Sequence, residues 1–512
     1  MSRLSRNAHS GGRTGGLLLR LLPLGVLALG ACRWRDSLLT VNGGTGAGGD
    51  AGVSVDAGSS PSIQSCPSVP GAPPGVAPLP TLAQVAYQRT ELTAYVHFGL
   101  NTFNGDEGSD PPKDKVSLFN PDNLDANEWV TELKNAGFGQ ATLVAKTSTG
   151  FCLWPSQYTE FSVKNSPWKN GQGDVVKEFT DAMHAAGMRV GLYVAPLDDN
   201  YPSSSPSYET YFKNQLTELL TNYGPIYEIA FPGSQAQMSV DWSGIALHAH
   251  QLQPNVLLFM GPEIAGPGAD IRYLGNQVGQ ANRQTSSVGS LNGGLSSIWY
   301  PAESPVSDRG PNTWFWHPNN SVISLSNLQS IYFTVVGMNA TLILNVPPAT
   351  SGQFDTPDVD LLRQFGAWYT SLYQTNLVHG QTVTADSTWG NSGFEATKVL
   401  DGDPCTYWAA GSGKTSARLE VTPAAAITFN TISFREPIEL GERVTAYHIE
   451  IKQNGRWNKN PTDVSNAAIA GTVIGQRQLW QLGSTTADAI ALVIDSAKDV
   501  PAIAEFGVYL TR

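Results

Sequence analysis

The sequence predicts two folded domains, a (β/α)8-type barrel over residues 81–375 and a β-sandwich over residues 376–512. In the first region, short apolar runs alternate with helical segments, as in parallel sheets whose strands are connected by helices. In the second region, alternating apolar and polar residues form short runs between turn residues, with no clear helix. A chain of 512 residues is long enough to bury a core in each domain.

The pattern of residues 1–32 predicts a lipoprotein signal peptide. Arginines precede an apolar run at residues 21–29 that is too short to span a bilayer. The run ends in LGAC, which resembles a bacterial lipoprotein cleavage box and implies that Cys32 is lipidated. The alternatives are a plain signal peptide or an unprocessed apolar helix. A lipid anchor would make the membrane a partner and place the protein in the bacterial cell envelope, at the outer membrane or cell surface; otherwise we expect secretion.

Residues 33–80 predict a disordered tether, because a segment this rich in Gly, Ala, Ser and Pro cannot bury enough apolar surface to fold. The remaining cysteines, Cys66, Cys152 and Cys405, are widely scattered and indicate neither a disulfide framework nor a metal motif. Cys152 lies in an apolar run and is expected to be a buried thiol.

Six apolar runs of the first region predict buried strands. They are residues 93–99, 140–146, 189–196, 226–231, 256–260 and 340–346. Helical periodicity covers residues 123–136, 174–186 and 208–223, and each of these segments is followed by a glycine suited to a left-handed cap. A doubly wound sheet is the alternative to the barrel, but no Gly-rich phosphate loop follows a strand.

The overall composition excludes one class of partner. A net charge of −12 argues against nucleic acid. Thirteen Trp and seventeen Tyr residues supply rings that suit the faces of sugars, although most such rings belong to ordinary cores.

Motifs across residues 82–370 resemble the α-L-fucosidases of glycoside hydrolase family 29, specifically the branch linked to α-1,3/1,4-fucosyl groups. They occur in the family's order at residues 97–103 (HFGLNTF), 150–156 (GFCLWPS), 166–171 (SPWKNG), 214–224 (NQLTELLTNYG), 270–276 (DIRYLGN), 299–303 (WYPAE), 314–317 (WFWH) and 342–348 (LILNVPP). Residues 399–408 and 436–444 resemble the discoidin-like (F5/8 type C) sandwich attached to the same branch, which implies that the second domain has a galactose-binding-like fold. The resemblance implies retaining hydrolysis, which needs two carboxylates about 5 Å apart.

Both catalytic positions implied by the resemblance have lost their carboxylate. The nucleophile position falls on Pro232 and the acid/base position on Gln277. Proline has no acid, and glutamine cannot deliver and recover a proton near neutral pH. Other sugar-facing positions of the family also differ, namely Thr147, Ser148, Leu197 and Ala230. We therefore expect a catalytically impaired member of the family.

Six residues at matching positions are candidates for substrate binding. They are His97, Glu107, Arg272, Glu303, Trp314 and Trp316, and most lie at or after predicted strand ends, where barrel sites are built. Arg272 could instead brace a strand end or pair with Asp270. No cofactor is expected, except that discoidin-like folds sometimes hold a structural calcium ion.

Three functions remain open from the sequence. The first is a silent fucosidase homologue that binds fucosylated or related oligosaccharides. The second is an active glycosidase that uses displaced carboxylates, for which the candidates are Asp198, Asp199, Glu228, Asp241, Glu263 and Glu303. Of these, Glu228 should lie about 13 Å deeper in its strand than Pro232, at roughly 3.3 Å per residue. The third is a structural envelope lipoprotein without a sugar ligand.

Overall fold

The computed structural model describes Cys66 and residues 69–105, 107, 113–201, 204–232, 240–262, 264–275, 277–291, 296–390 and 392–511. The expected signal peptide, its Cys32 and most of the expected tether lie outside these residues. In the part of the chain that is described, no helix is both long and apolar enough to cross a membrane.

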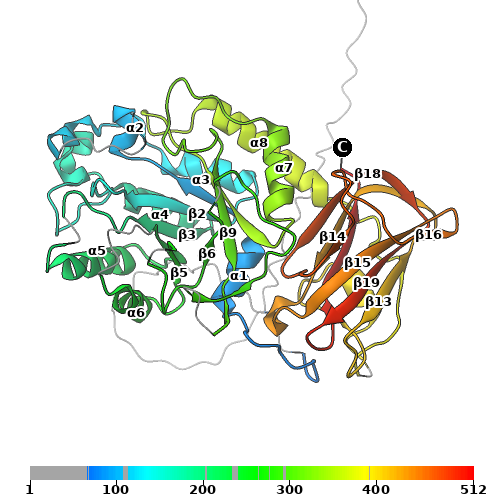
Figure 1. Ribbon diagram of the computed structural model, residues 1–512. Helices are drawn as coiled ribbons and strands as arrows, with labels where there is room; N and C mark the ends of the chain where they lie inside the picture. The colour runs from blue at the N-terminus through cyan, green and yellow to red at the C-terminus, as the bar shows by residue number, and fades with distance from the viewer. Residues whose placement is uncertain are drawn as a thin grey trace, which may run out of the picture. The chain divides into compact units, whose positions relative to one another are not determined.

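Eight parallel strands form the first domain (Figure 1). In spatial order they are β5 (Leu257–Met260), β4 (Glu228–Phe231), β3 (Arg189–Val194), β2 (Gln140–Lys146), β1 (Leu92–Val96), β10 (Ala340–Asn345), β9 (Ala302–Ser307) and β6 (Arg272–Tyr273). A parallel bridge between Phe259 and Ile271 joins the two ends of this order, β5 and β6. The sheet is therefore nearly closed, which confirms the predicted barrel.

The six apolar runs are all strands of the barrel, but β6 and β9 were not predicted. β6 has only two residues, and β9 carries a glutamate, two serines and a proline, so neither shows the apolar run of a buried strand. A short antiparallel ladder of β7 (Val288–Gly289) and β8 (Ile298–Trp299) lies between them in the sequence.

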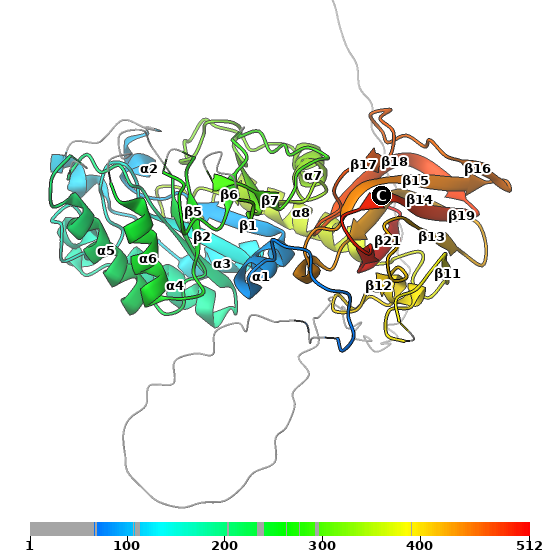
Figure 2. The same ribbon diagram turned by 60° about the horizontal axis from the view of Figure 1, so that its bottom comes forward.

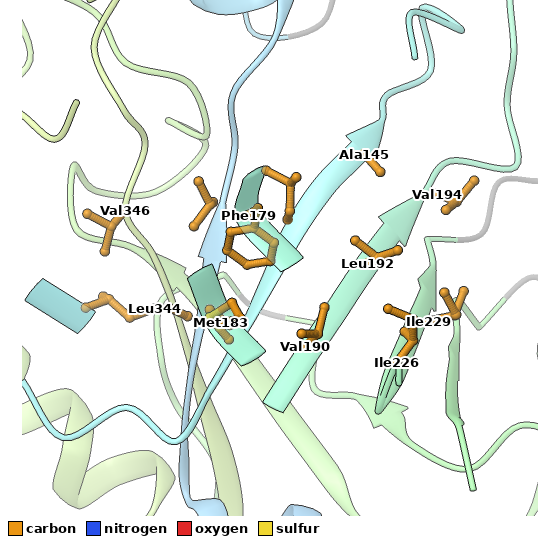
Figure 3. Close-up of a cluster of buried hydrophobic side chains, with 14 of the residues drawn as sticks. Ala145, Phe179, Met183, Val190, Leu192, Val194, Ile226, Ile229, Leu344 and Val346 are labelled. Carbon is orange, nitrogen blue, oxygen red and sulfur yellow. The ribbon is translucent and has the colours of Figure 1, made fainter. Parts of the chain in front are cut away.

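Helices cover the outside of the strands (Figures 1 and 2). They are α2 (Leu100–Asn104), α3 (Ala126–Asn135), α4 (Val175–Ala185), α5 (Tyr208–Asn222), α6 (Trp242–Leu252), α7 (Leu325–Val335) and α8 (Thr356–Tyr373). The glycines Gly137, Gly187 and Gly224 follow α3, α4 and α5 with φ of 95°, 67° and 72°, as expected for left-handed caps. Figure 3 shows the packing that results, in which Phe179 and Met183 of α4 lie near the outward side chains of the strands.

Helix α1 (Leu82–Thr90) forms the floor of the barrel at the amino-terminal ends of the strands. It begins with a capping box between Thr81 and Gln84. The side chain of Tyr87 is buried inside the barrel, where it packs with Ala230 and Phe259.

The second domain consists of antiparallel sheets, as predicted. One contains β11 (Thr382–Ala385), β13 (Ala417–Thr422), β19 (Ala489–Ala497), β15 (Val444–Gln453), β16 (Arg456–Asn458) and β17 (Ala470–Gly471). Another contains β18 (Gln478–Ala487), β14 (Ile427–Arg435) and β21 (Glu505–Tyr509), and β12 (Trp408–Ala409) pairs with β20 (Ala502–Ile503). Aliphatic and aromatic side chains from these strands form a separate core.

Two expectations about the amino-terminal region are wrong. Cys66 and Cys405 form a disulfide across a sequence separation of 339 residues, a pairing that the spacing of the cysteines could not indicate. Cys152 is a buried free thiol, as expected. The expected tether also ends earlier than residue 80, because Val69 and Ala72 pack against the core of the sandwich. We call Cys66 and residues 69–80 the strap.

Candidate functional site at the barrel mouth

The carboxyl-terminal ends of the strands and the loops that follow them form the barrel mouth, and His97 lies there, directly after β1. Its Nδ1 is 2.6 Å from Oδ1 of Asn345, the last residue of β10. The amide nitrogen of Asn345 donates to the carbonyl of Trp314 at 2.8 Å and to the hydroxyl of Ser307 at 3.2 Å. Oδ1 is therefore the acceptor, and His97 donates through Nδ1.

This arrangement leaves His97 neutral with a lone pair on Nε2. Burial lowers its pKa to about 4, against a smaller opposing effect of the Asn345 hydrogen bond. A neutral imidazole whose Nδ1 donates must accept at Nε2. Rings surround it, with centroids at 5.3 Å for Trp314, 5.4 Å for Phe315 and 5.8 Å for Tyr193. The site thus combines one hydrogen-bond acceptor with aromatic surface.

Glu107 fixes the loop that carries the rings of Trp314 and Phe315. Its carboxylate accepts hydrogen bonds from the backbone N–H of Trp314 at 2.7 Å and of Phe315 at 3.2 Å. It also lies 2.7 Å from Nε2 of His317. Trp316 in the same loop donates its indole N–H to Asp355 at 3.1 Å, at the start of α8. The loop over residues 313–317 is therefore held from several sides.

Pro232 and Gln277 both lie beyond strand ends, which the apolar run at residues 226–231 predicted for Pro232. Pro232 follows β4 and is partly buried. Gln277 comes shortly after β6 with φ of 49°, and its Oε1 is buried without a hydrogen-bond partner. The Gln277 side chain also hydrogen-bonds to Tyr273, which lowers the pKa of that phenol against the larger, raising effect of burial. Neither position offers a carboxylate.

The other carboxylates considered near the mouth have different roles. Asp198 is fully buried, forms an ion pair with Lys146 at 3.0 Å and accepts from the Tyr211 hydroxyl at 2.9 Å. Asp241 is exposed and caps α6 by accepting from the backbone of Gly244 at 2.9 Å. Asp199 is exposed, and Glu263 lies outside the described residues.

Two predicted site residues lie away from the mouth. Glu303 is the second residue of β9, about 13 Å below its end at roughly 3.3 Å per residue. It is fully buried and accepts hydrogen bonds from Tyr87 at 2.6 Å and Tyr95 at 3.3 Å. Arg272 donates to the carbonyl oxygens of Tyr300, at 2.9 Å, and Ser286. It thus braces backbone, but it does not pair with Asp270, whose carboxylate accepts from Leu258 N–H.

The interior of the barrel holds a second buried acid, Glu228. One of its oxygens accepts from Gln140, and the other has no hydrogen-bond partner. Burial, and then the nearby charge of Glu303, raise its pKa well above the ordinary range. Burial also raises the pKa of Glu303 to about 7. We call Glu228 and Glu303 the inner acid pair.

Within the described residues, no group of three or more His, Cys, Asp or Glu side chains is placed to hold a metal ion. A structural calcium ion in the sandwich, which the resemblance to discoidin-like folds allows, therefore gains no support from such a cluster.

The α-L-fucosidase family model matches residues 86–372, more than half of the chain, and the F5/8 type C domain model matches residues 382–506. The chain belongs to the α-L-fucosidase family. It is 34% identical to α-L-fucosidase 1 of Arabidopsis thaliana over 466 residues, which cover 85% of this chain and 88% of that protein.

Solved structures of this family are similar throughout both domains. A glycoside hydrolase 29 family member from an unknown rumen bacterium is 30% identical, with a TM-score of 0.73, over 86% of this chain and 78% of its own. A Ruminococcus gnavus GH29 fucosidase in complex with fucose is 27% identical, with a TM-score of 0.78, over 88% of this chain and 98% of its own.

Sequence reasoning missed two features of the mouth. It did not single out Asn345, although this residue is the polar end of an apolar strand, a pattern that could have pointed to it. It also could not foresee that Glu107 contacts a loop more than 200 residues away.

Proposed function

We propose that this member of the α-L-fucosidase family binds fucosylated or related glycans at the barrel mouth and does not hydrolyse them. The observation that carries the proposal is the chemistry at the two catalytic positions, which are Pro232 and Gln277. Retaining hydrolysis needs two carboxylates about 5 Å apart on either side of the scissile bond. A proline and an amide cannot form a glycosyl-enzyme or shuttle a proton.

The roles of the remaining acids support the absence of hydrolysis. Moving Asp198 toward a substrate would leave the buried ammonium of Lys146 without its ion pair, which is strongly unfavourable. The inner acid pair is buried in the barrel below the mouth. Catalysis tolerates little displacement, since an error of about 1 Å can cost about a hundredfold in rate.

Binding is supported by what the mouth retains. His97 Nε2 can accept a hydrogen bond from a sugar hydroxyl, and the buried Oε1 of Gln277 is a second acceptor that lacks a partner. The rings of Trp314 and Tyr193 offer apolar surface for the C–H face of a pyranose. Fucose, with its methyl group and hydroxyls, fits this combination.

We also propose that the protein works in the cell envelope or outside the cell. The Cys66–Cys405 disulfide supports this location, since disulfides persist in oxidising compartments. The amino-terminal pattern, which resembles a lipoprotein signal peptide, also supports this location.

Calorimetric titration of the full chain with α-1,3- and α-1,4-fucosylated trisaccharides tests binding, and an aryl α-L-fucoside tests hydrolysis. We expect saturable binding without turnover, and loss of the imidazole in His97→Ala should weaken binding about tenfold, the effect of one buried hydrogen bond. His379→Ala is the matched control, because His379 is exposed and lies beyond the barrel. Turnover at high enzyme concentration would refute the proposal that the site does not hydrolyse glycans, and would favour hydrolysis by carboxylates at other positions of the mouth. Absence of binding would favour a structural role.

A further inference from the structure

The strap is attached to the sandwich at four points. Besides the disulfide, whose Cα atoms are 5.1 Å apart, the strap accepts hydrogen bonds at the carbonyls of Gly71 and Pro74. The donors are the indole of Trp389, at 2.7 Å, and the guanidinium of Arg443, at 2.8 Å. The backbone N–H of Val76 donates to Leu440 at 2.8 Å.

Immediately after the strap, the chain enters the barrel. Gln84 of α1 donates to the carbonyls of Asp270 and Trp299, both at 3.0 Å. Tyr87 donates to Glu303 at 2.6 Å, and Gln88 donates to Ser287 at 2.8 Å. The strap and α1 therefore connect the two domains at a second place, far in sequence from the link between α8 and β11.

Arg89 joins the end of α1 to the disulfide. One guanidinium nitrogen lies 3.3 Å from the sulfur of Cys66, and the other forms an ion pair with Glu439 of the sandwich. It also lies 3.5 Å from the carbonyl of Pro404, the residue before Cys405. The disulfide thus lies where the strap, α1 and a loop of the sandwich meet.

Apart from the disulfide, the strap has few attachments. Its three hydrogen bonds to the sandwich are made by exposed or partly exposed residues of the strap. Of its apolar side chains, Pro73 is buried, whereas Val69 and Ala72 are only partly buried. Leu79, near its end, is 48% exposed. Segments with few buried apolar contacts and exposed hydrogen bonds open with a small free energy. The covalent bond is therefore the main constraint on the strap, whereas α1 has its own buried contacts.

We propose that the Cys66–Cys405 disulfide is a redox-sensitive lock that fastens the strap to the sandwich, independently of any glycan at the mouth. In the oxidised chain, a force on the residues before Cys66 passes to the sandwich through the disulfide before it can be transmitted along the strap to α1. A dithiol reductant supplies two electrons and two protons, becomes a disulfide itself and leaves two thiols. The strap then leaves the sandwich, while α1 stays in the barrel.

Hydrogen exchange of the full chain, with and without dithiothreitol, tests the lock. We expect exchange in residues 69–80 to rise about tenfold or more on reduction, toward that of an open segment, and exchange in α1 to stay the same. Mass analysis after native alkylation should find Cys66 and Cys405 labelled only after reduction. Buried Cys152 should stay unlabelled in both states.

Cys66→Ser and Cys405→Ser should each reproduce the reduced pattern without reductant. Trp389→Phe is the matched control, because it removes the indole donor to Gly71 and keeps the disulfide, so its exchange should stay close to that of the oxidised chain. Labelling of both cysteines without reductant would overturn the proposal. So would unchanged exchange of the strap after reduction, or release of α1 together with the strap.

Discussion

A single carboxylate, that of Glu107, organises the mouth through a chain of contacts. It holds the backbone of Trp314, whose carbonyl accepts from Asn345, and Asn345 in turn fixes the ring of His97. The orientation of the loop over residues 313–317 and the direction of the lone pair on His97 Nε2 therefore both depend on a residue that need not touch a ligand. Glu107 is better described as a positioning residue than as a sugar ligand.

Replacing this carboxylate should loosen the loop without unfolding the barrel. In Glu107→Gln the amide oxygen can still accept from one N–H, but the charge-assisted contacts to Trp314 and His317 are lost. We expect faster hydrogen exchange in residues 313–317 and glycan affinity about tenfold lower, as for a hydrogen bond to a charged group. Exchange measured without ligand tests the positioning role separately from binding.

Glu160→Gln is the control for this change, because Glu160 is 84% exposed and lies on a different loop. Equal exchange of residues 313–317 in Glu107→Gln and the parent protein would contradict the positioning role, whatever the glycan affinity.

The sequence predicted the residues of the mouth where a strand end marked them, and failed where the role depends on tertiary contacts. His97 lies near the end of the apolar run at residues 93–99, and Pro232 directly follows the run at residues 226–231. The barrel pattern alone therefore placed both near the carboxyl ends of strands. Arg272 and Glu303 belong to β6 and β9, whose polar composition concealed both the strands and the side-chain directions. Only the closed sheet shows that Glu303 points to the buried interior.

At the level of the strands, the inner acid pair helps to explain why β9 was not recognised as a buried strand from the sequence. Glu303 in β9 and Glu228 in β4 face an interior that also contains Tyr87, Tyr95 and Gln140. Tyr87, Tyr95 and Gln140 donate hydrogen bonds to the two acids, but one oxygen of Glu228 remains unpartnered. A buried acid that lacks donors keeps its proton. Burial of the two acids in one interior therefore favours their neutral forms.

The inner acid pair should make stability depend on pH. The pKa of Glu303 in the folded protein is about 7, above its ordinary value of 4.5. Its stabilising contribution is therefore complete below pH 4.5 and is lost as the pH rises from 4.5 to 7. The loss could reach about 3 kcal/mol at 1.36 kcal/mol per pKa unit. Glu303→Gln, which is neutral at every pH, should show a smaller decline between pH 5 and pH 8, measured by urea unfolding.

The exposed substitution Glu160→Gln serves again as the control and should keep the parent pH dependence. A decline in Glu303→Gln as steep as in the parent protein would show that other buried acids, such as Glu436 in the sandwich, dominate this pH range.

At the scale of the whole molecule, the barrel and the sandwich are joined by buried ionic contacts. Glu91, which ends α1 with φ of 58°, accepts from Arg477 at 2.7 Å and from Arg435 at 2.8 Å, both in the sandwich. Arg283 of the barrel donates to the carbonyl of Leu479 at 2.6 Å and lies over the ring of Trp480. Contacts of this kind resemble a core more than a hinge, so we expect the two domains to unfold together.

Arg477→Met tests this coupling, because it removes a buried charge and keeps most of the side-chain volume. Glu91 would then keep Arg435 as its cationic partner, in a site where its own side chain is only 4% exposed. Loss of one partner of a buried pair costs about 3 kcal/mol or more, so calorimetry should show a lower unfolding temperature and a transition that broadens or splits. Arg363→Met, which breaks an ion pair of a 62% exposed arginine with Glu132, should cost less than about 1 kcal/mol. Equal effects of the two substitutions would mean that the junction does not couple the domains.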